Sequence, residues 1–429
     1  MTIVRFELAG TPEDGDEPRP AARDELRALT AAAADAGAAW TQLGDTLLVT
    51  GKPARLERAG AGRAPASRVE VPTARLHLVI QNGRQFQQEH PGVPVLVDKG
   101  RYLVVDLDPA EAGRLAEPAE RHLPCYRVRA LPADTVVFEQ RAPAPERARA
   151  APGPRLDAVV SRDAFAADLR TLAGFRTRHS TSDEFRTALG WADGVLHDLG
   201  FTTRIQTVPL PGGTTQNLIA ERPGTGGDGR ATDGRAVLVT AHLDSVNSQD
   251  GTAAPAPGAD DNGSGAAGLL AIARALRDHP GARELRLVLF GGEEQGLHGS
   301  LRYVAELDRA ERDRIDAVVN MDMIASRNTL SPTVLLEGSA VSRSVLNGLV
   351  AAAQAHTALT VQTSLLPFNS DHVPFIDSGI PAVLTIEGAD GANDRIHTAD
   401  DTLEHVDHDL ALEILRMNVA YLVEALGQV

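Results

Sequence analysis

Three short stretches between residues 236 and 325 combine imidazole, carboxylate and glycine in a pattern that could bind metal ions. They are Ala241-His242-Leu243-Asp244, the segment from Gly258 to Gly265, and Gly292-Glu293-Glu294. A hydrolytic centre with two metal ions needs hard or borderline ligands at fixed positions, one carboxylate shared between the ions, and a free base beside them. Histidine and carboxylates meet these needs, so the sequence predicts a metal site in this region.

The strongest single signal is the acidic pair Asp260-Asp261. Small residues follow it, so the backbone can approach closely, and a helix is expected from Gly265. A carboxylate there could bridge two ions, or it could simply cap the helix N-terminus, which favours Asp. His242 supplies an imidazole, and Asp244 is placed to hydrogen-bond a metal ligand, although a His-Leu-Asp in a loop is a weak signal by itself.

Further acids and a second imidazole complete the set. Glu293 and Glu294 are adjacent carboxylates that repel each other unless a cation is near; one could bind metal while the other takes a proton from water, or both could lie in a solvated loop. Asp322 ends a buried run, where an unpaired carboxylate is costly, and backbone donors could satisfy it instead. His397 lies close to Asp401 in the sequence. The combination, in this order, carries more weight than any member.

The elements that would position these residues are short apolar runs. Residues 237–240 lead into His242, residues 285–290 into the Glu pair, and residues 317–320 into Asp322. Such runs, bounded by glycine and polar residues and alternating with helical segments, indicate a parallel sheet in an α/β domain. Ligands bind at the carboxyl ends of strands in sheets of this kind.

The composition limits the class of protein. The chain has 429 residues, 43% of them hydrophobic, so a folded protein with two domains is expected. The formal net charge of -16 argues against nucleic acid or an anionic membrane surface as a partner. Cys125 is the only cysteine, which leaves no intrachain disulfide and no thiolate metal site. The first residues show no signal peptide, so a cytoplasmic location is expected, with secretion through a preceding leader as the alternative.

The best linker in the sequence is the stretch 141–155, which is rich in Pro, Ala and Arg. It predicts an N-terminal α+β accessory domain over residues 1–140 and a second domain over residues 156–429. Residues 46–49 with Pro53 resemble residues 102–105 with Pro109, at an offset of 56. This weak echo indicates either two copies of a strand followed by a helix that starts with Pro, or a coincidence of common residues.

The motifs together resemble the M28 family of zinc metallopeptidases, and in particular its bacterial leucyl aminopeptidases with two zinc ions. The resemblance covers roughly residues 160–429 and rests on the segments 242–245, 257–265, 292–300, 321–324, 370–372 and 397–402. It implies a mixed, mostly parallel central sheet flanked by helices, as in zinc-dependent exopeptidases with the phosphorylase/hydrolase-like fold. It does not extend to the first 140 residues.

Carried over by position, the resemblance implies two zinc ions per chain and a peptide substrate. His242 and Asp322 would hold one ion, Glu294 and His397 the other, and Asp261 would bridge them. The resemblance also implies a cis peptide bond between Asp261 and Asn262, and the role of general base and acid for Glu293. The ligand set of His and carboxylates also suits manganese or cobalt.

Two departures from the family pattern concern the oxyanion and substrate choice. Some relatives have a Tyr just before the last metal-binding His or in the loop near Ser370; here Ile396 and the run Pro367-Phe368-Asn369 stand at these places. Asn369 could donate a hydrogen bond instead. Apolar residues flank the motifs and predict a pocket for a large N-terminal side chain, with core packing as the alternative for each: Met323, Ile324, Phe368, Ile396.

Three alternatives to an aminopeptidase remain open. A carboxypeptidase or dipeptidase on the same scaffold would want an Arg to hold a C-terminal carboxylate, and Arg327 and Arg395 are the nearby candidates. Glutaminyl cyclases share the fold, but resemble a version with one zinc ion. A binding homologue without catalysis would be expected to lack metal ligands, whereas all five are present in this sequence.

Overall fold

The structure, a computed structural model, describes residues 2–8, 21–60, 64–116, 125–144, 160–225, 234–279 and 281–427. The chain divides into two compact units: unit 1 is Met1–Ala142 with Gln362–Ser364, and unit 2 is Pro143–Val361 with Leu365–Val429. Most of the predicted linker at 141–155, and the centre of the glycine-rich loop after residue 225, lie outside the described residues.

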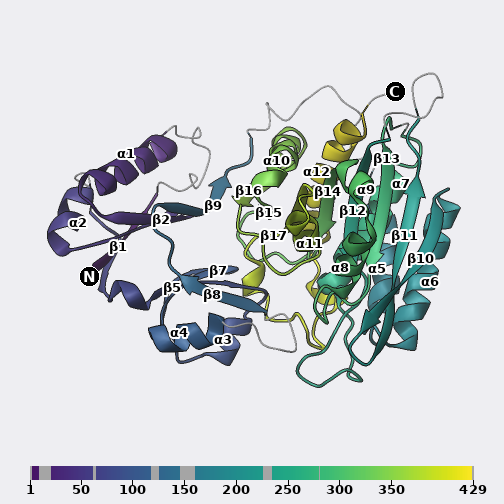
Figure 1. Cartoon of the computed structure of the whole chain (residues 1–429), viewed down its shortest axis with the longest axis horizontal. Helices are drawn as coiled ribbons and strands as arrows, with labels where there is room; N and C mark the ends of the chain where they lie inside the picture. Colours follow the sequence, from purple (N-terminus) through teal and green to yellow (C-terminus); the bar gives the residue numbers. More distant parts are fainter. Residues whose placement is uncertain are drawn as a thin grey trace. The chain divides into compact units, whose positions relative to one another are not determined.

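Unit 2 is built on a mixed sheet, as the sequence predicts (Figure 1). The strand order is β10 (Thr202–Leu210), β11 (Gly213–Arg222), β13 (Glu284–Phe290), β12 (Ala236–His242), β14 (Ile315–Met321), β17 (Ala382–Glu387), β15 (Thr333–Glu337) and β16 (Thr360–Ser364). The four middle strands β13, β12, β14 and β17 run parallel, whereas β10, β11 and β15 pair antiparallel with their neighbours. The parallel strands are buried on both faces, which explains their nearly continuous apolar sequences.

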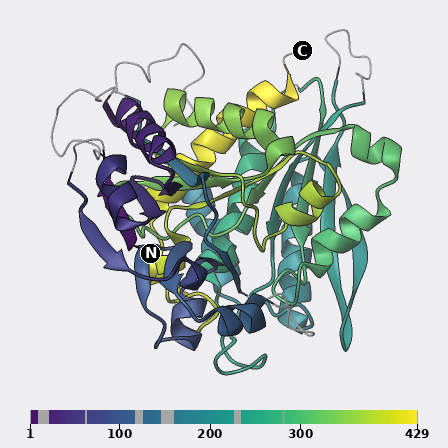
Figure 2. The same cartoon turned by 60° about the vertical axis from the view of Figure 1, so that its left-hand side comes forward.

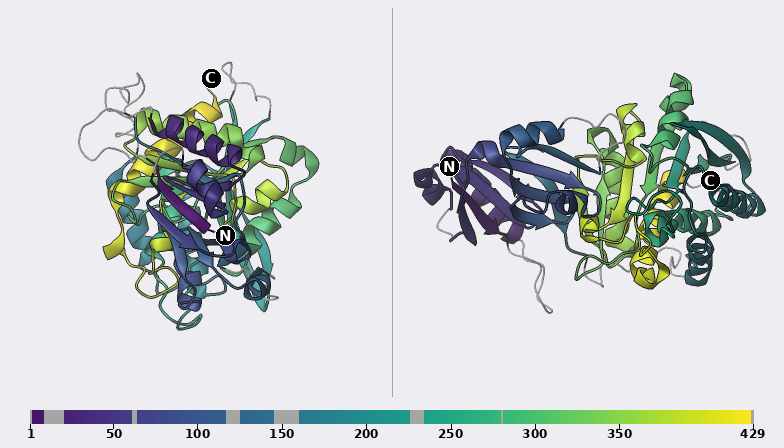
Figure 3. Two further views of the ribbon diagram at one scale, coloured as in Figure 1. Left: turned by 90° about the vertical axis from the view of Figure 1, so that its left-hand side faces the viewer. Right: turned by 90° about the horizontal axis from the view of Figure 1, so that it is seen from below.

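Helices cover both faces of this sheet (Figure 2; Figure 3). Successive side chains of β12 alternate between two cores, with Val237 and Val239 in one and Leu238 in the other. The first core also contains residues of α5 (Arg162–Ala173), α6 (Asp183–Asp198), α7 (Gly265–Ala275), α10 (Arg343–His356) and α12 (His408–Leu426). The second contains residues of α8 (His298–Glu306) and α11 (His372–Asp377). The short α9 (Arg309–Asp313) follows α8.

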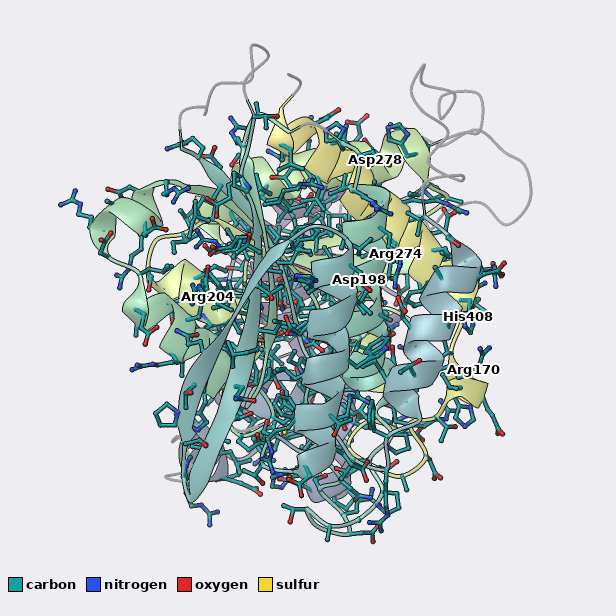
Figure 4. The ribbon with its side chains drawn as sticks, turned by 90° about the vertical axis from the view of Figure 1, so that its right-hand side faces the viewer. Arg170, Asp198, Arg204, Arg274, Asp278 and His408 are labelled. Carbon is teal, nitrogen blue, oxygen red and sulfur yellow. The ribbon has the colours of Figure 1, made fainter. Side chains whose placement is uncertain are left out.

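Serine caps fix the two helices that precede the sheet. Ser161 Oγ accepts from the Ala164 amide at the start of α5, and Ser182 Oγ accepts from the Phe185 amide at the start of α6. Figure 4 shows these two helices together with α7, labelled at Arg170 in α5, Asp198 in α6 and Arg274 in α7. In the part of the chain that the structure describes, no helix is long and apolar enough to cross a membrane.

Unit 1 contains two modules with the same order of elements. The first is β1 (Thr2–Glu7), α1 (Ala21–Asp35), β2 (Ala39–Leu43), β3 (Thr46–Gly51), α2 (Pro53–Ala59) and β4 (Ser67–Glu70). The second is β5 (Leu76–Gln81), α3 (Gln85–Glu89), β6 (Val95–Lys99), β7 (Tyr102–Asp106), α4 (Pro109–Ala116) and β8 (Tyr126–Ala130), and β9 (Thr135–Arg141) comes after it. The strand orders β2-β3-β1-β4 and β6-β7-β5-β8 correspond strand by strand.

The echo in the sequence coincides with this repeat. Strands β2 and β6, strands β3 and β7, and helices α2 and α4 each begin 56 residues apart. Both hairpins turn on a glycine of positive φ, Gly44 at 59° and Gly100 at 72°, a conformation that a two-residue hairpin loop requires. The interpretation as two copies of one module is therefore confirmed over this segment.

Candidate metal centre

All five predicted metal ligands meet at the carboxyl ends of the parallel strands. His242 is the last residue of β12, Asp322 follows β14, and Glu294 lies in the loop after β13. Asp261 lies in the turn just before α7, and His397 in the loop between β17 and α12. These loops come from distant parts of the sequence, and the parallel sheet brings them to one edge.

The ligand atoms form two clusters that share Asp261. In the first, His242 Nε2 lies 3.2 Å from Asp322 Oδ1 and 3.4 Å from Asp261 Oδ1. In the second, His397 Nε2 lies 3.1 Å from Asp261 Oδ2 and 2.9 Å from Glu294 Oε2. Within each cluster the ligand atoms all lie within 4.8 Å of one another. The two oxygens of Asp261 thus face different clusters, which is the arrangement that a bridging carboxylate needs.

Hydrogen bonding in the two clusters fits a metal ion at each of them. Nδ1 of His242 lies 3.1 Å from the main-chain oxygen of Asp244, which can only accept, so Nδ1 carries a proton. Nε2 then faces the carboxylates of Asp261 and Asp322, so a proton or a metal cation must lie between these groups. Among the described residues, buried Glu294 Oε1 has no hydrogen-bond partner, which is a sign that a cation belongs at this site.

The carboxylates are crowded together, and their pKa values shift in different directions. Against the effect of burial, hydrogen bonds to His242 and His397 lower the pKa of Asp261. Burial raises the pKa of Glu294 to about 7, against the attraction of His397. Burial also raises the pKa of Glu293 well above its ordinary value, with His242 opposing and Asp322 adding to the rise. Divalent cations relieve this repulsion, so the donor set and its electrostatics both suit metal.

Asp244 hydrogen-bonds the predicted ligand His242, as the sequence predicts, but it does so through its main chain. Its carboxylate lies 3.7 Å from His242 Nδ1, and the main-chain oxygen makes the hydrogen bond to the ring instead. The carboxylate accepts from the amides of Glu293, at 3.4 Å, and Glu294, at 3.2 Å. A single buried residue thus orients His242 through its main chain and the glutamate loop through its side chain.

Two supporting groups behind the ligands were not predicted. Asp401 accepts from the amides of Asp260 and Asp261, both at 2.9 Å, and so fixes the turn that carries the bridging carboxylate. Ser370 Oγ donates to Asp322 Oδ2 at 2.7 Å. Both residues lie within the segments that resemble the family. Asp401 is close to His397 in the sequence and Ser370 is close to His372, and this proximity was the sign of a supporting role.

The backbone around Asp261 is unusual, as the family resemblance implies. The Asp261–Asn262 peptide bond is cis, so that expectation is confirmed. Gly258 has a φ of 53°, and a Cβ at this position would lie 2.4 Å from the main-chain oxygen of Asp261. Only glycine fits there without displacing the backbone.

The residues proposed for an apolar pocket are all buried. Ile324 is 0% exposed and belongs to the first core, so the alternative of core packing is confirmed for this residue. Met323 and Phe368 are 3% exposed and Ile396 is 9% exposed. Arg327, a candidate for binding a C-terminal carboxylate, is paired with Asp407 at 2.6 Å.

Comparisons with known proteins agree with this geometry. The model of peptidase family M28 matches residues 217–422. The chain is 31% identical over 309 residues to leupeptin-inactivating enzyme 1 of Streptomyces exfoliatus, covering 66% of this chain and 65% of that protein. It is 36% identical over 179 residues to aminopeptidase YwaD of Bacillus subtilis, covering 40% of this chain and 36% of that protein. The chain therefore spans less than two thirds of the length of these relatives.

A solved structure shares the fold of this chain. The structure of the LapA aminopeptidase of Legionella pneumophila superposes with a TM-score of 0.56 and 20% sequence identity, over 82% of this chain and 99% of that one. This likeness concerns the fold alone, while the family match covers every predicted ligand from His242 to His397. Over residues 217–422, the chain is therefore similar to peptidase family M28.

Proposed function

We propose that unit 2 is a metal-dependent aminopeptidase that removes large apolar residues from the N-termini of peptides with two zinc ions. The observation that carries the proposal is the pair of ligand clusters that share Asp261. One relative supports the direction of the reaction, because YwaD is an aminopeptidase by name.

The two clusters indicate which residues would hold the ions. His242 and Asp322 would bind one ion, Glu294 and His397 the other, and the two oxygens of Asp261 would divide between them. Bound zinc supplies polarisation of the scissile carbonyl and of water. Manganese or cobalt would suit the same donor set.

Glu293 is the group proposed to move the proton. It belongs to neither cluster, and its amide is held by Asp244 beside that of Glu294. Its carboxylate would accept the proton of the attacking water and then deliver it to the leaving amine. Because burial raises its pKa, the carboxyl can hold the proton between these two steps.

The carboxypeptidase alternative is weaker for a specific reason. Arg327 is neutralised by Asp407, which leaves Arg395 as the remaining nearby arginine for a C-terminal carboxylate.

Metal analysis combined with hydrolysis tests the proposal. About two zinc ions per chain are expected, together with release of p-nitroaniline from leucyl and phenylalanyl p-nitroanilides that is lost on chelation and restored by zinc. N-acetylated versions of the same substrates are the matched control and should not be cleaved. Cleavage of blocked peptides from their C-termini would instead support a carboxypeptidase, and absence of both metal and turnover would reject the proposal.

A further inference from the structure

Arg178 is a buried arginine that precedes the region matched to the family and belongs to neither ligand cluster. It is 0% exposed. We infer that Arg178 is a positioning residue that clamps together the two ends of the loop between His242 and Asp261, an inference that rests on the function proposed above.

The guanidinium binds main-chain oxygens at both ends of this loop. Nε donates to Leu243 O at 2.8 Å, immediately after His242. Nη1 donates to Pro257 O at 2.5 Å and Nη2 to Gly258 O at 2.8 Å, just ahead of the turn that contains Asp261. A further Nη1 bond to Leu172 O, at 2.9 Å, ties the group to the end of α5.

The main chain of Arg178 strengthens the same connection. Its amide donates to Ser245 Oγ at 3.1 Å, and the Ser245 amide donates back to Arg178 O at 3.3 Å. Ser245 Oγ in turn donates to Ala256 O at 2.7 Å, near the other end of the same loop. The two ends of the loop are therefore held together by one side chain and by a short ladder of hydrogen bonds beside it.

A neighbouring residue extends the clamp to the loop after β13. Ser180 Oγ accepts from the Gly292 amide at 2.7 Å, directly before Glu293 and Glu294. The segment 177–182 thus contacts both ends of the loop between β12 and α7 and the loop that follows β13. The first of these loops leads from His242 to Asp261, and the second carries Glu294.

The charge of Arg178 and its hydrogen bonds predict opposite effects on metal binding. Among the described residues no carboxylate forms an ion pair with it, and the carboxylates of Asp401, Asp244 and Asp261 attract it from longer range. Removing a nearby positive charge alone would make cations bind more tightly. Removing the clamp would make them bind more weakly, because buried carbonyls lose their donors and the ligands lose their fixed positions.

The direct contacts outweigh the distant charge, so weaker binding is the expected result. Four carbonyls on three segments depend on one planar group, whereas every carboxylate acts beyond ion-pair distance. A lysine would keep the charge but present a single nitrogen, which cannot reach carbonyls spread over these segments. The lysine variant should therefore resemble a neutral one rather than the wild type.

The test compares zinc affinity in the full-length chain and in the variants Arg178→Met, Arg178→Lys and Arg176→Met. Arg176 is the matched control, since it is exposed and its guanidinium binds only one carbonyl, Ala253 O, among the hydrogen bonds described. Zinc dissociation constants are measured on metal-free protein by competition with a chromophoric chelator, and folding by near-ultraviolet circular dichroism. Both Arg178 variants should bind zinc about 10–100-fold more weakly, as for other outer partners of metal ligands. Their kcat for leucyl p-nitroanilide should fall with little change in KM.

Three results would overturn the inference. These are wild-type zinc affinity in a folded Arg178→Met protein, tighter zinc binding in that variant, and full recovery of affinity by Arg178→Lys. If the Met variant does not fold, the Lys variant alone decides. Zinc binding by the wild type without hydrolysis of any substrate would reject the proposed function only, because the affinities of the variants would still show whether Arg178 clamps the site.

Discussion

Replacing Ser370 by alanine should weaken metal binding at His242 and Asp322 without unfolding the protein. Ser370 Oγ donates to Asp322 Oδ2 at 2.7 Å and accepts from Asn320 Nδ2 at 2.9 Å. Thr240 Oγ1 donates to Asn320 Oδ1 at 2.7 Å. This buried series of hydrogen bonds leaves Asp322 Oδ1 directed at His242. The substitution removes the hydrogen bond between Ser370 and Asp322.

The size of the effect depends on the bond that is lost. A hydrogen bond to a charged group contributes about 1.5–3 kcal/mol, and Asn320 would lose the partner of its Nδ2 in addition. Since 1.4 kcal/mol corresponds to about a tenfold change in an equilibrium constant, zinc affinity should fall about 10–100-fold. The ligand atoms themselves are retained, so binding should be weakened rather than abolished.

The assay is a zinc titration of metal-free protein, with kcat measured at saturating zinc. Ser378→Ala is the matched control, because Ser378 is half-buried and its hydroxyl makes no hydrogen bond among those described. Equal zinc affinity in the wild type and in folded Ser370→Ala would refute the reasoning. An equal loss in both serine variants would show that the effect is not specific to Asp322.

Three further outcomes are expected. Glu293→Gln should retain bound metal and lower kcat by about 10²–10⁴-fold, and wild-type turnover at full metal content would exclude Glu293 as the base. Gly258→Ala should lower both melting temperature and zinc affinity, because its Cβ would meet Asp261 O at 2.4 Å; Gly251→Ala is the control, since Gly251 also has a positive φ, 89°, but open space around it. Burial and the charge of Glu89 raise the pKa of Tyr126 to about 12, so the folded state disfavours ionisation and should lose stability as pH rises from about 10 to 12. Urea unfolding at several pH values should show this loss reduced in Tyr126→Phe.

The sequence was sufficient to predict the class of fold and the residues that converge. Apolar runs ahead of His242, Glu293 and Asp322 correspond to β12, β13 and β14, because strands buried on both faces require such runs. The topology rule for parallel sheets then places the loops after these strands at one edge. His397 follows no strand directly, and in that case the family resemblance, rather than a pattern of residues, identified the position.

The supporting contacts could not be predicted in the same way. Asp244 uses its main chain toward His242 and its side chain toward the glutamate loop, a division that depends on the path of both loops. Arg178 binds main-chain carbonyls, which every residue possesses. The types of residue in the sequence therefore predict neither its partners nor its burial. Ser370 lies 48 residues from Asp322 along the chain, and only the fold brings them together.

The register of β12 against β14 explains why the first cluster forms. Thr240 pairs with Asn320 in this parallel ladder, and the hydrogen bond between their side chains reinforces the pairing. His242 and Asp322 each lie two residues further on, so both side chains project on the same face at the same height. A shift of one residue would turn one of them to the opposite face of the sheet. The metal centre therefore depends on strand register as much as on the ligands. Thr240 and Asn320, which belong to neither ligand cluster, help to set the 3.2 Å separation of His242 Nε2 and Asp322 Oδ1.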